Sequence, residues 1–148
     1  GLAKALLARL LTQQGALHEA KDAFDSIREP WLQIHPQVII ERDRLLRRIG
    51  KSTLQERKQW LARVDALPDE WIIERKVQLL LDEGQPGEAK RLLLSTPFQK
   101  VHQTYSRTNL WKQICDQLHL SFYPIPQSLG EDRLARFGAY REFEESYQ

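Results

Sequence analysis

Two short stretches of the chain share one skeleton, and this repetition constrains the fold more than any other feature of the sequence. Residues 15–20 read Gly-Ala-Leu-His-Glu-Ala, and residues 84–89 read Gly-Gln-Pro-Gly-Glu-Ala. In both, a glycine is followed after three residues by Glu-Ala, and an apolar-periodic run begins there. Gly84 lies 69 positions after Gly15, and Gly50 falls close to the midpoint. A period of about 34 residues is typical of chains built from repeated helical hairpins.

Apolar residues recur every three to four positions along most of the chain, which predicts amphipathic helices. Glycine adopts the left-handed conformation that ends a helix without steric cost, so Gly15 and Gly84 each predict a helix end. Pro36 and Pro86 predict helix starts, because the first helical residue needs no N–H group. Before residue 97, the expected helices span residues 2–14, 17–29, 36–49, 54–67, 70–83 and 86–96.

A polar stretch at residues 52–56 predicts how the fourth of these helices begins. It contains two overlapping capping boxes, Ser52 with Gln55 and Thr53 with Glu56. In a capping box, the two side chains satisfy free backbone N–H groups at the start of a helix. We therefore expect a side-chain cap at this position.

The helix pairs resemble tetratricopeptide repeats (TPRs). Gly15, Ala20 and Phe24 match the turn glycine and the small and large positions of that family's second helix. The aromatic residue and the glycine usual in its first helix are replaced by Lys4 and Ala8. The resemblance covers about the first two thirds of the chain. It implies an all-α, right-handed stack of about three hairpins, with a concave groove lined by the first helix of each pair.

The chain changes character after residue 119. Residues 122–126 read Phe-Tyr-Pro-Ile-Pro, which predicts an extended segment rather than a helix or a central strand. A capping box at residues 128–131 then precedes a run that predicts a C-terminal helix. We expect residues 120–148 to belong to the same domain as the repeats of residues 1–119. Four aromatic residues are expected to seal the last hairpin: Phe122, Tyr123, Phe137 and Tyr140.

Motifs in the last third of the chain carry a second resemblance. They are Thr96-Pro97-Phe98, Tyr105-Ser106-Arg107-Thr108, residues 124–132 and Phe137-Gly138-Ala139-Tyr140-Arg141. They are similar to the end of large bacterial proteins that join a sugar-enzyme-like region to TPRs. The resemblance implies a fragment of a larger bacterial protein, with any catalysis in an upstream part. It therefore offers one alternative function, the accessory helical region of a carbohydrate-active enzyme.

Polar and aromatic side chains recur at the positions predicted to line the groove. Arginines there are suited to a carboxylate or an acidic peptide, because a guanidinium group binds a carboxylate with two parallel hydrogen bonds. The alternative is a solvated face with ion pairs within a helix, such as Glu41 with Arg44 or Arg48. Trp71 is the best candidate for an aromatic anchor, although tryptophans more often pack in the core or between repeats. The predicted partner-binding residues are Arg9, Gln13, Arg44, Arg48, Trp71, Glu74, Gln78 and Asp82.

Two other constellations suggest different chemistry. Seven basic residues between positions 42 and 58 give a nucleic-acid-binding alternative, but Glu41, Asp43 and Glu56 interrupt them and no aromatic residues are interleaved. Cys115 and His119 have the spacing of two metal ligands on one helix face, yet a structural zinc site needs four ligands. We expect a buried free cysteine beside a surface histidine instead.

Composition limits the function classes that remain. Of the 148 residues, 41% are hydrophobic and 28% are charged, and the net charge is +2, so the sequence does not demand a polyanionic partner. No phosphate-binding loop, dinucleotide fingerprint or serine-hydrolase motif occurs. We expect a non-enzymatic protein without a metal or cofactor, located in the cytoplasm and not in a membrane. Its expected partners are a protein, a peptide or upstream domains of the same chain, and a homodimer is possible.

Overall fold

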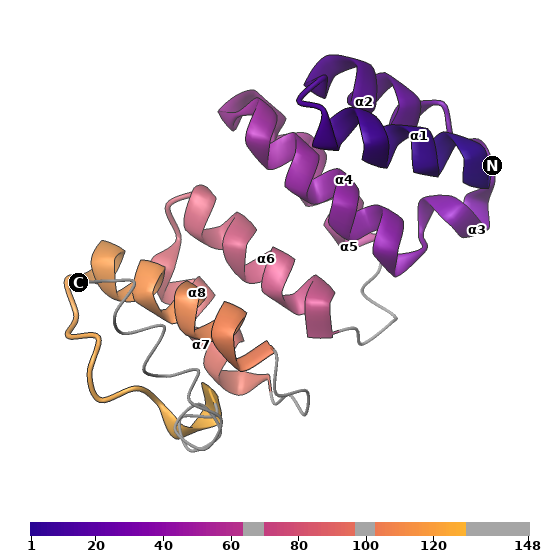
Figure 1. Cartoon of the computed structure of the whole chain (residues 1–148). Helices are drawn as coiled ribbons and strands as arrows, with labels where there is room; N and C mark the ends of the chain where they lie inside the picture. The colour runs from indigo at the N-terminus through magenta and orange to yellow at the C-terminus, as the bar shows by residue number, and fades with distance from the viewer. Residues whose placement is uncertain (64–69, 97–102, 130–148) are drawn as a thin grey trace. The chain divides into compact units, whose positions relative to one another are not determined.

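The computed structural model describes residues 1–63, 70–96 and 103–129, and within these ranges it contains helices and no strand (Figure 1). This confirms the all-α prediction. The chain divides into two compact units, residues 1–75 and 76–148, each of which makes most of its contacts within itself. The elements are α1 (Leu2–Gln13), α2 (Leu17–Asp25), α3 (Pro30–Gln33), α4 (Pro36–Ile49), η1 (Lys51–Thr53), α5 (Leu54–Ala62), α6 (Glu70–Asp82), α7 (Pro86–Ser95), α8 (Gln103–Leu118) and η2 (Gln127–Leu129).

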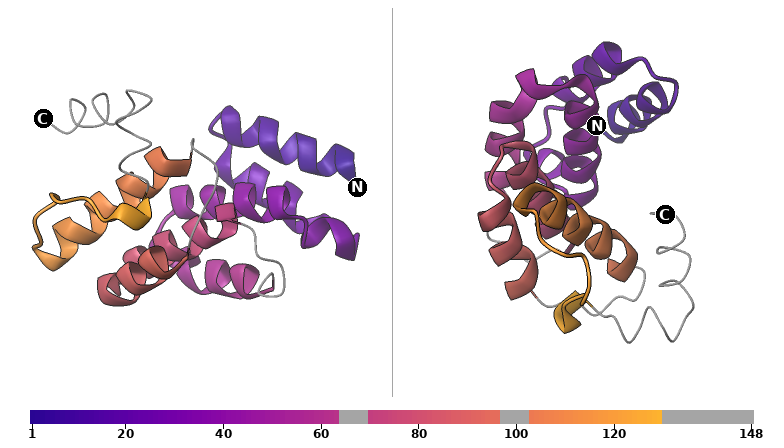
Figure 2. Two further views of the ribbon diagram at one scale, coloured as in Figure 1. Left: turned by 90° about the horizontal axis from the view of Figure 1, so that it is seen from below. Right: turned by 90° about the vertical axis from the view of Figure 1, so that its left-hand side faces the viewer.

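In the first unit, α1 and α2 form an antiparallel pair that lies side by side in each view (Figures 1 and 2). Ala8 of α1 and Ala20 of α2 are both 0% exposed, since small side chains let the two helices approach closely. Phe24 fills the space one turn further along α2. Helix α4 packs against α2, and α5 packs against α4. The first hairpin thus places its small and large residues as the sequence predicted.

The predicted repeat is visible in the hydrogen bonds that end the first helix of each glycine-marked pair. Gly15 and Gly84 have φ angles of +81° and +75°, the left-handed region that favours glycine. The residue after each glycine donates its backbone N–H to a carbonyl five residues earlier. These bonds are Ala16 N–H to Leu11 O at 2.9 Å and Gln85 N–H to Leu80 O at 2.8 Å. Each residue of the second bond lies 69 positions after its counterpart in the first. The two hairpins therefore share local geometry.

The second unit has its own core, formed by α6, α7, α8 and the segment after α8. Ala89, the counterpart of Ala20, is fully buried there. The indole N–H of Trp111 donates to the carbonyl oxygen of Phe122 at 3.0 Å, which holds the extended segment against α8. Ile125 and Leu129 are buried in the same core. Phe122 therefore packs against this core as predicted, whereas Tyr123 is 41% exposed.

Some predictions fall on residues outside the described ranges. They concern the helix after residue 130 and the sealing roles of Phe137 and Tyr140. The assignment of residues 1–148 to one domain stays a prediction.

Helix boundaries between the first two hairpins differ from the prediction. Helix α2 ends at Asp25, and the short helix α3 begins at Pro30, which was expected only to end a helix. Neither predicted capping box forms at the start of α5. The Thr53 hydroxyl instead donates to the carbonyl oxygens of Leu46 and Gly50, at 2.6 and 2.7 Å. The reason is η1, a tight turn before α5 that directs Thr53 back toward the end of α4.

Candidate functional site

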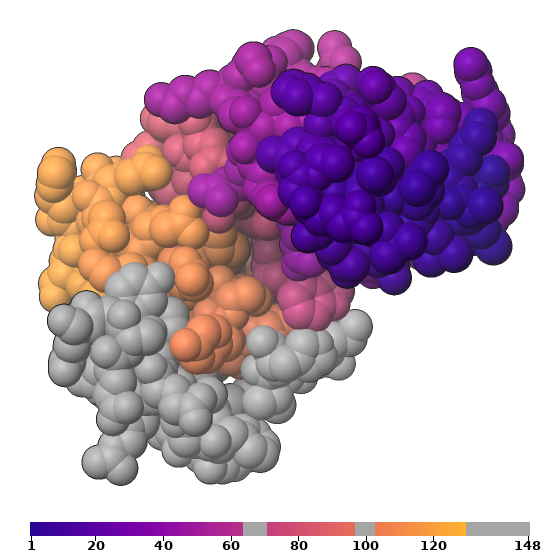
Figure 3. Space-filling view, turned by 45° about the horizontal axis from the view of Figure 1, so that its top comes forward, coloured from indigo at the N-terminus to yellow at the C-terminus, as the bar shows by residue number. Residues whose placement is uncertain are grey.

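Helix α1 buries Ala8 and exposes four of its five leucines. Ala8 faces α2, whereas Leu2, Leu6 and Leu10 are 64%, 56% and 54% exposed. These three residues are four positions apart, so they form one row along the outer side of the helix; we call it the leucine row. In the space-filling view, one face of α1 and α2, drawn in indigo, lies open toward the viewer (Figure 3). A contiguous exposed apolar patch of this kind commonly marks an interaction site.

A groove of about 230 Å³ adjoins the leucine row. Trp31 of α3 lines this groove and is 58% exposed. The short helix holds this tryptophan in place, because Leu32 is buried and the Gln33 side-chain amide donates to the Ile27 carbonyl oxygen at 2.7 Å. Three helices and the residue before α4 contribute to the lining, which consists of Leu2, Ala5, Leu6, Arg9, Trp31, Leu32, His35, Gln37, Val38 and Glu41.

The polar side of the groove is centred on Glu41. Its Oε1 accepts hydrogen bonds from Arg9 Nε and Gln37 Nε2, each at 2.8 Å. Glu41 therefore pairs across helices, whereas the sequence suggested Arg44 or Arg48 on its own helix. Arg9 is one of the predicted partner-binding residues, and its charge is balanced here. The groove thus offers an apolar floor and a neutralised edge, which suits an apolar partner better than a free carboxylate.

The other predicted partner-binding residues of the first unit have different surroundings. Gln13 and Arg44 are exposed. Arg48 is exposed and donates to the Thr12 carbonyl oxygen at 3.0 Å, which joins the ends of α4 and α1. Trp71 is half-buried and Glu74 is buried.

The two predicted residues of the second unit belong to a polar contact. Gln78 is buried, and its side-chain amide donates to Asp82 Oδ1 at 3.1 Å and to Gln113 Oε1 at 2.9 Å. The contact with Gln113 joins α6 to α8. Whether the eight predicted residues form one groove stays a prediction.

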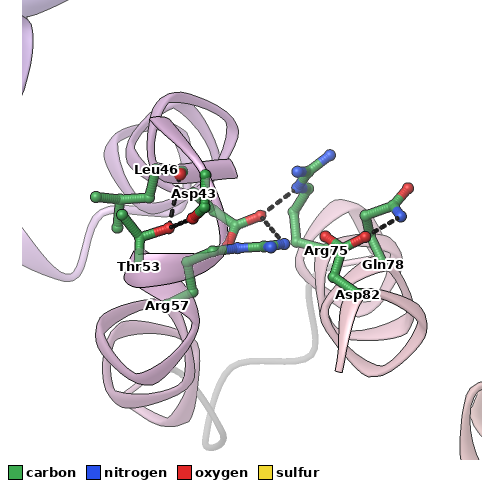
Figure 4. Close-up of polar contacts among 8 residues, drawn as sticks. Asp43, Leu46, Thr53, Arg57, Arg75, Gln78 and Asp82 are labelled. Carbon is green, nitrogen blue, oxygen red and sulfur yellow. Dashed lines mark hydrogen bonds and ion pairs between the residues drawn. The ribbon is translucent and has the colours of Figure 1, made fainter. Parts of the chain in front are cut away.

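A buried ion-pair cluster in the first unit was not anticipated from the sequence. The carboxylate of Asp43 on α4 accepts from Arg57 Nε of α5 at 2.8 Å and from Arg75 Nε of α6 at 2.6 Å (Figure 4). Burial lowers the pKa of the Arg75 guanidinium, and the nearby Asp43 carboxylate acts in the opposite direction. These three charged side chains lie on three helices. They hold the helices together and do not face a ligand.

The predicted basic cluster is not a single surface. Arg57 is occupied by Asp43, and Arg42 is buried against aromatic rings. The Arg42 guanidinium lies 3.8 Å from the centre of the Trp60 ring, and its Nη2 donates to the Phe24 carbonyl oxygen at 2.5 Å. Burial lowers the pKa of Arg42. Two of the seven basic residues, Arg42 and Arg57, are therefore buried and do not face a phosphate backbone, which weakens the nucleic-acid alternative.

Cys115 is a buried free thiol, and its Sγ donates to the Ser121 carbonyl oxygen at 3.6 Å. His119 is exposed, as predicted, with a φ angle of +57° at the end of α8. His102 lies outside the described residues. In the described part of the chain, no three His, Cys, Asp or Glu side chains are grouped so that they could hold a metal ion. No helix in these ranges has the length and apolar character needed to cross a membrane.

The repeated hairpins and their glycine-ended first helices define a TPR-like helical-repeat protein. A crystal structure of a TPR-domain containing protein from Parabacteroides distasonis is similar to this chain, with 56% sequence identity and a TM-score of 0.82. The match covers 89% of this chain and 23% of that chain, so the present chain spans less than a quarter of its length. The model of a family described as a C-terminal domain matches residues 1–114, and the chain belongs to that family. No curated protein matches the chain.

Proposed function

We propose that the chain is a non-catalytic interaction module of a larger bacterial protein, and that it binds protein through the leucine row and the adjoining groove. One observation carries this proposal: the leucine row of α1 is exposed beside an exposed Trp31. Burying exposed apolar side chains against a partner releases about 25 cal/mol for each Å² of apolar surface. Tryptophan is also enriched among residues that dominate binding energy.

The charge pattern supports a protein rather than a nucleic-acid partner. The leucine row carries no charge, and the groove edge is neutralised by the pairing of Arg9 with Glu41. Gln13, Arg44 and Arg48 remain candidates for contacts at the margin, since all three are exposed. We also propose a cytoplasmic location, for which the single free cysteine is the supporting observation.

A binding measurement tests this function. The chain is used as bait, a protein that it captures reproducibly is purified, and its Kd is measured by calorimetry. Trp31→Ala is expected to weaken binding by about 2 kcal/mol, which is roughly thirtyfold in Kd. His18→Ala, at an exposed position of α2 outside the groove, is the matched control and is expected to bind normally. Equal Kd values for the chain and for Trp31→Ala would contradict the proposal.

A further inference from the structure

The internal repeat identifies the counterparts of the leucine row. A shift of 69 positions carries α1 onto α6, and it superimposes the backbone bonds that end the two helices. The same shift relates Ala20 to Ala89, both fully buried. Each residue of α1 can therefore be compared with its counterpart in α6. The pairs that matter are Leu2 with Trp71, Leu6 with Arg75 and Leu10 with Leu79.

The counterparts in α6 are less exposed than the leucines of α1. Leu79 is buried, and Trp71 and Arg75 are each only partly exposed. The covering contact at Arg75 is known, because its Nε donates to Asp43 Oδ2 at 2.6 Å. Asp43 belongs to α4, a helix of the preceding hairpin. This position of a first helix is therefore where the hairpin before it makes contact.

A neighbouring side of α1 and of α6 contacts the helix that follows each hairpin in the sequence. Arg9 bonds to Glu41 of α4, the next long helix after its own hairpin. Its counterpart Gln78 bonds to Gln113 of α8, which again follows its own hairpin. The following hairpin thus meets the side that carries Arg9 or Gln78. The leucine row borders that side, since Leu2 and Leu6 line the groove beside α4. Its central residue, Leu6, is at the position whose counterpart in α6, Arg75, meets a preceding hairpin.

We infer that the leucine row is the docking face for a helical hairpin that precedes α1 in the polypeptide that the gene encodes. The inference rests on the function proposed above, and it names the partner of that site. The Parabacteroides distasonis chain supports it, since this chain aligns with only 23% of it, and so does the description of the family as a C-terminal domain.

The repeat also predicts the chemistry of the docked hairpin. Arg75 in α6 receives a carboxylate from the preceding hairpin, whereas its counterpart in α1 is Leu6, which has no charge to pair. A carboxylate buried against Leu6 would lose its hydration without compensation. The preceding hairpin is therefore expected to carry an aliphatic or small residue where α4 carries Asp43.

Site-specific photocrosslinking in the natural polypeptide tests the inference. Leu6 is replaced by p-benzoylphenylalanine, the protein is irradiated in cells, and the products are mapped by mass spectrometry. His18, exposed on α2, receives the same replacement as the matched control. A second variant carries the replacement at Leu10, so that a folding defect caused by the replacement at one position does not decide the test. Circular dichroism checks that each variant remains helical.

The expected result is an intramolecular crosslink from position 6 to a helical segment upstream of α1, with at least tenfold more product than from position 18. A crosslink between two copies, or to another protein, would overturn the hairpin as partner and leave the proposed function standing. A yield no greater than that of the control at positions 6 and 10, or products confined to residues 1–148, would overturn both. A gene that encodes no helical segment before α1 would overturn the inference alone.

Discussion

Arg57 Nε lies 2.8 Å from Asp43 Oδ1, and both side chains are 1% exposed. Asp43 uses its other carboxylate oxygen for Arg75, so one buried anion joins two cations from two other helices. A buried ion pair is costly to form, because both charges leave water, and it is strongly destabilising when only one partner is removed. The cluster therefore fixes the relation of α4, α5 and the start of α6 within the first unit.

The first prediction concerns this carboxylate. Asp43→Asn removes the charge that pairs with the buried Arg57, and is expected to lower the free energy of unfolding by about 3–5 kcal/mol. Urea denaturation followed by circular dichroism measures the change. Asp22→Asn, at an exposed position of α2, is the control and is expected to change stability by less than about 0.5 kcal/mol. A loss below 1 kcal/mol for Asp43→Asn would show that the cluster is not buried as described.

The second prediction concerns the helix ends of the repeat. Gly15→Ala and Gly84→Ala each force a side chain into the left-handed region, which costs about 1–2 kcal/mol. No atom lies within 4 Å of the added methyl group at either site, so the cost comes from the backbone alone. The two losses should therefore be similar. Gly87→Ala, inside α7 with equal space and no positive φ, is the control and is expected to be neutral or stabilising.

The sequence predicted helix ends well because a glycine at a helix terminus acts locally. Gly15 and Gly84 end their helices where expected, and Pro36 and Pro86 begin theirs. The small residue Ala20 was also placed correctly, since it is defined by its spacing from Gly15. Such signals need only a few neighbouring residues.

Features that depend on distant partners could not be predicted from the sequence. The leucines of α1 form a clear apolar stripe, but periodicity does not tell which face packs when Ala8 lies on the other side. Tryptophans more often pack in the core or between repeats, but Trp31 is exposed, because it lies on the short helix α3, which the sequence did not predict and which buries Leu32 instead. Asp43 and Arg57 are 14 positions apart on different helices, so nothing local in the sequence shows that they pair.

The third prediction concerns the only cysteine. Burial raises the pKa of the Cys115 thiol, and the adjacent Asp116 carboxylate adds to the shift. The folded thiol therefore stays protonated at pH values where an unfolded thiol ionises. Its contribution to stability is complete below the ordinary thiol pKa of about 8.5, and is lost as the pH rises through the higher folded value.

Reaction with a disulfide reagent at pH 8 is the measurement for this cysteine. The folded chain is expected to react at least a hundredfold more slowly than the chain in urea, because the thiolate is the reactive form. The control carries Cys115→Ser with Gln55→Cys, which moves the thiol to an exposed position of α5 and should react rapidly without urea. Fast reaction of Cys115 in the folded chain would contradict its burial.

The most direct test of the account is hydrogen exchange of the α1 amides, compared between residues 1–148 alone and the natural polypeptide. Docking of the leucine row is expected to slow exchange in the natural polypeptide by at least tenfold, since local opening would also have to break the contact. The double variant Leu6→Lys, Leu10→Lys should remove this difference. In residues 1–148 alone, the same variant should change stability by less than about 0.5 kcal/mol, because both leucines are more than half exposed. Equal exchange of the α1 amides in the two proteins would contradict the account.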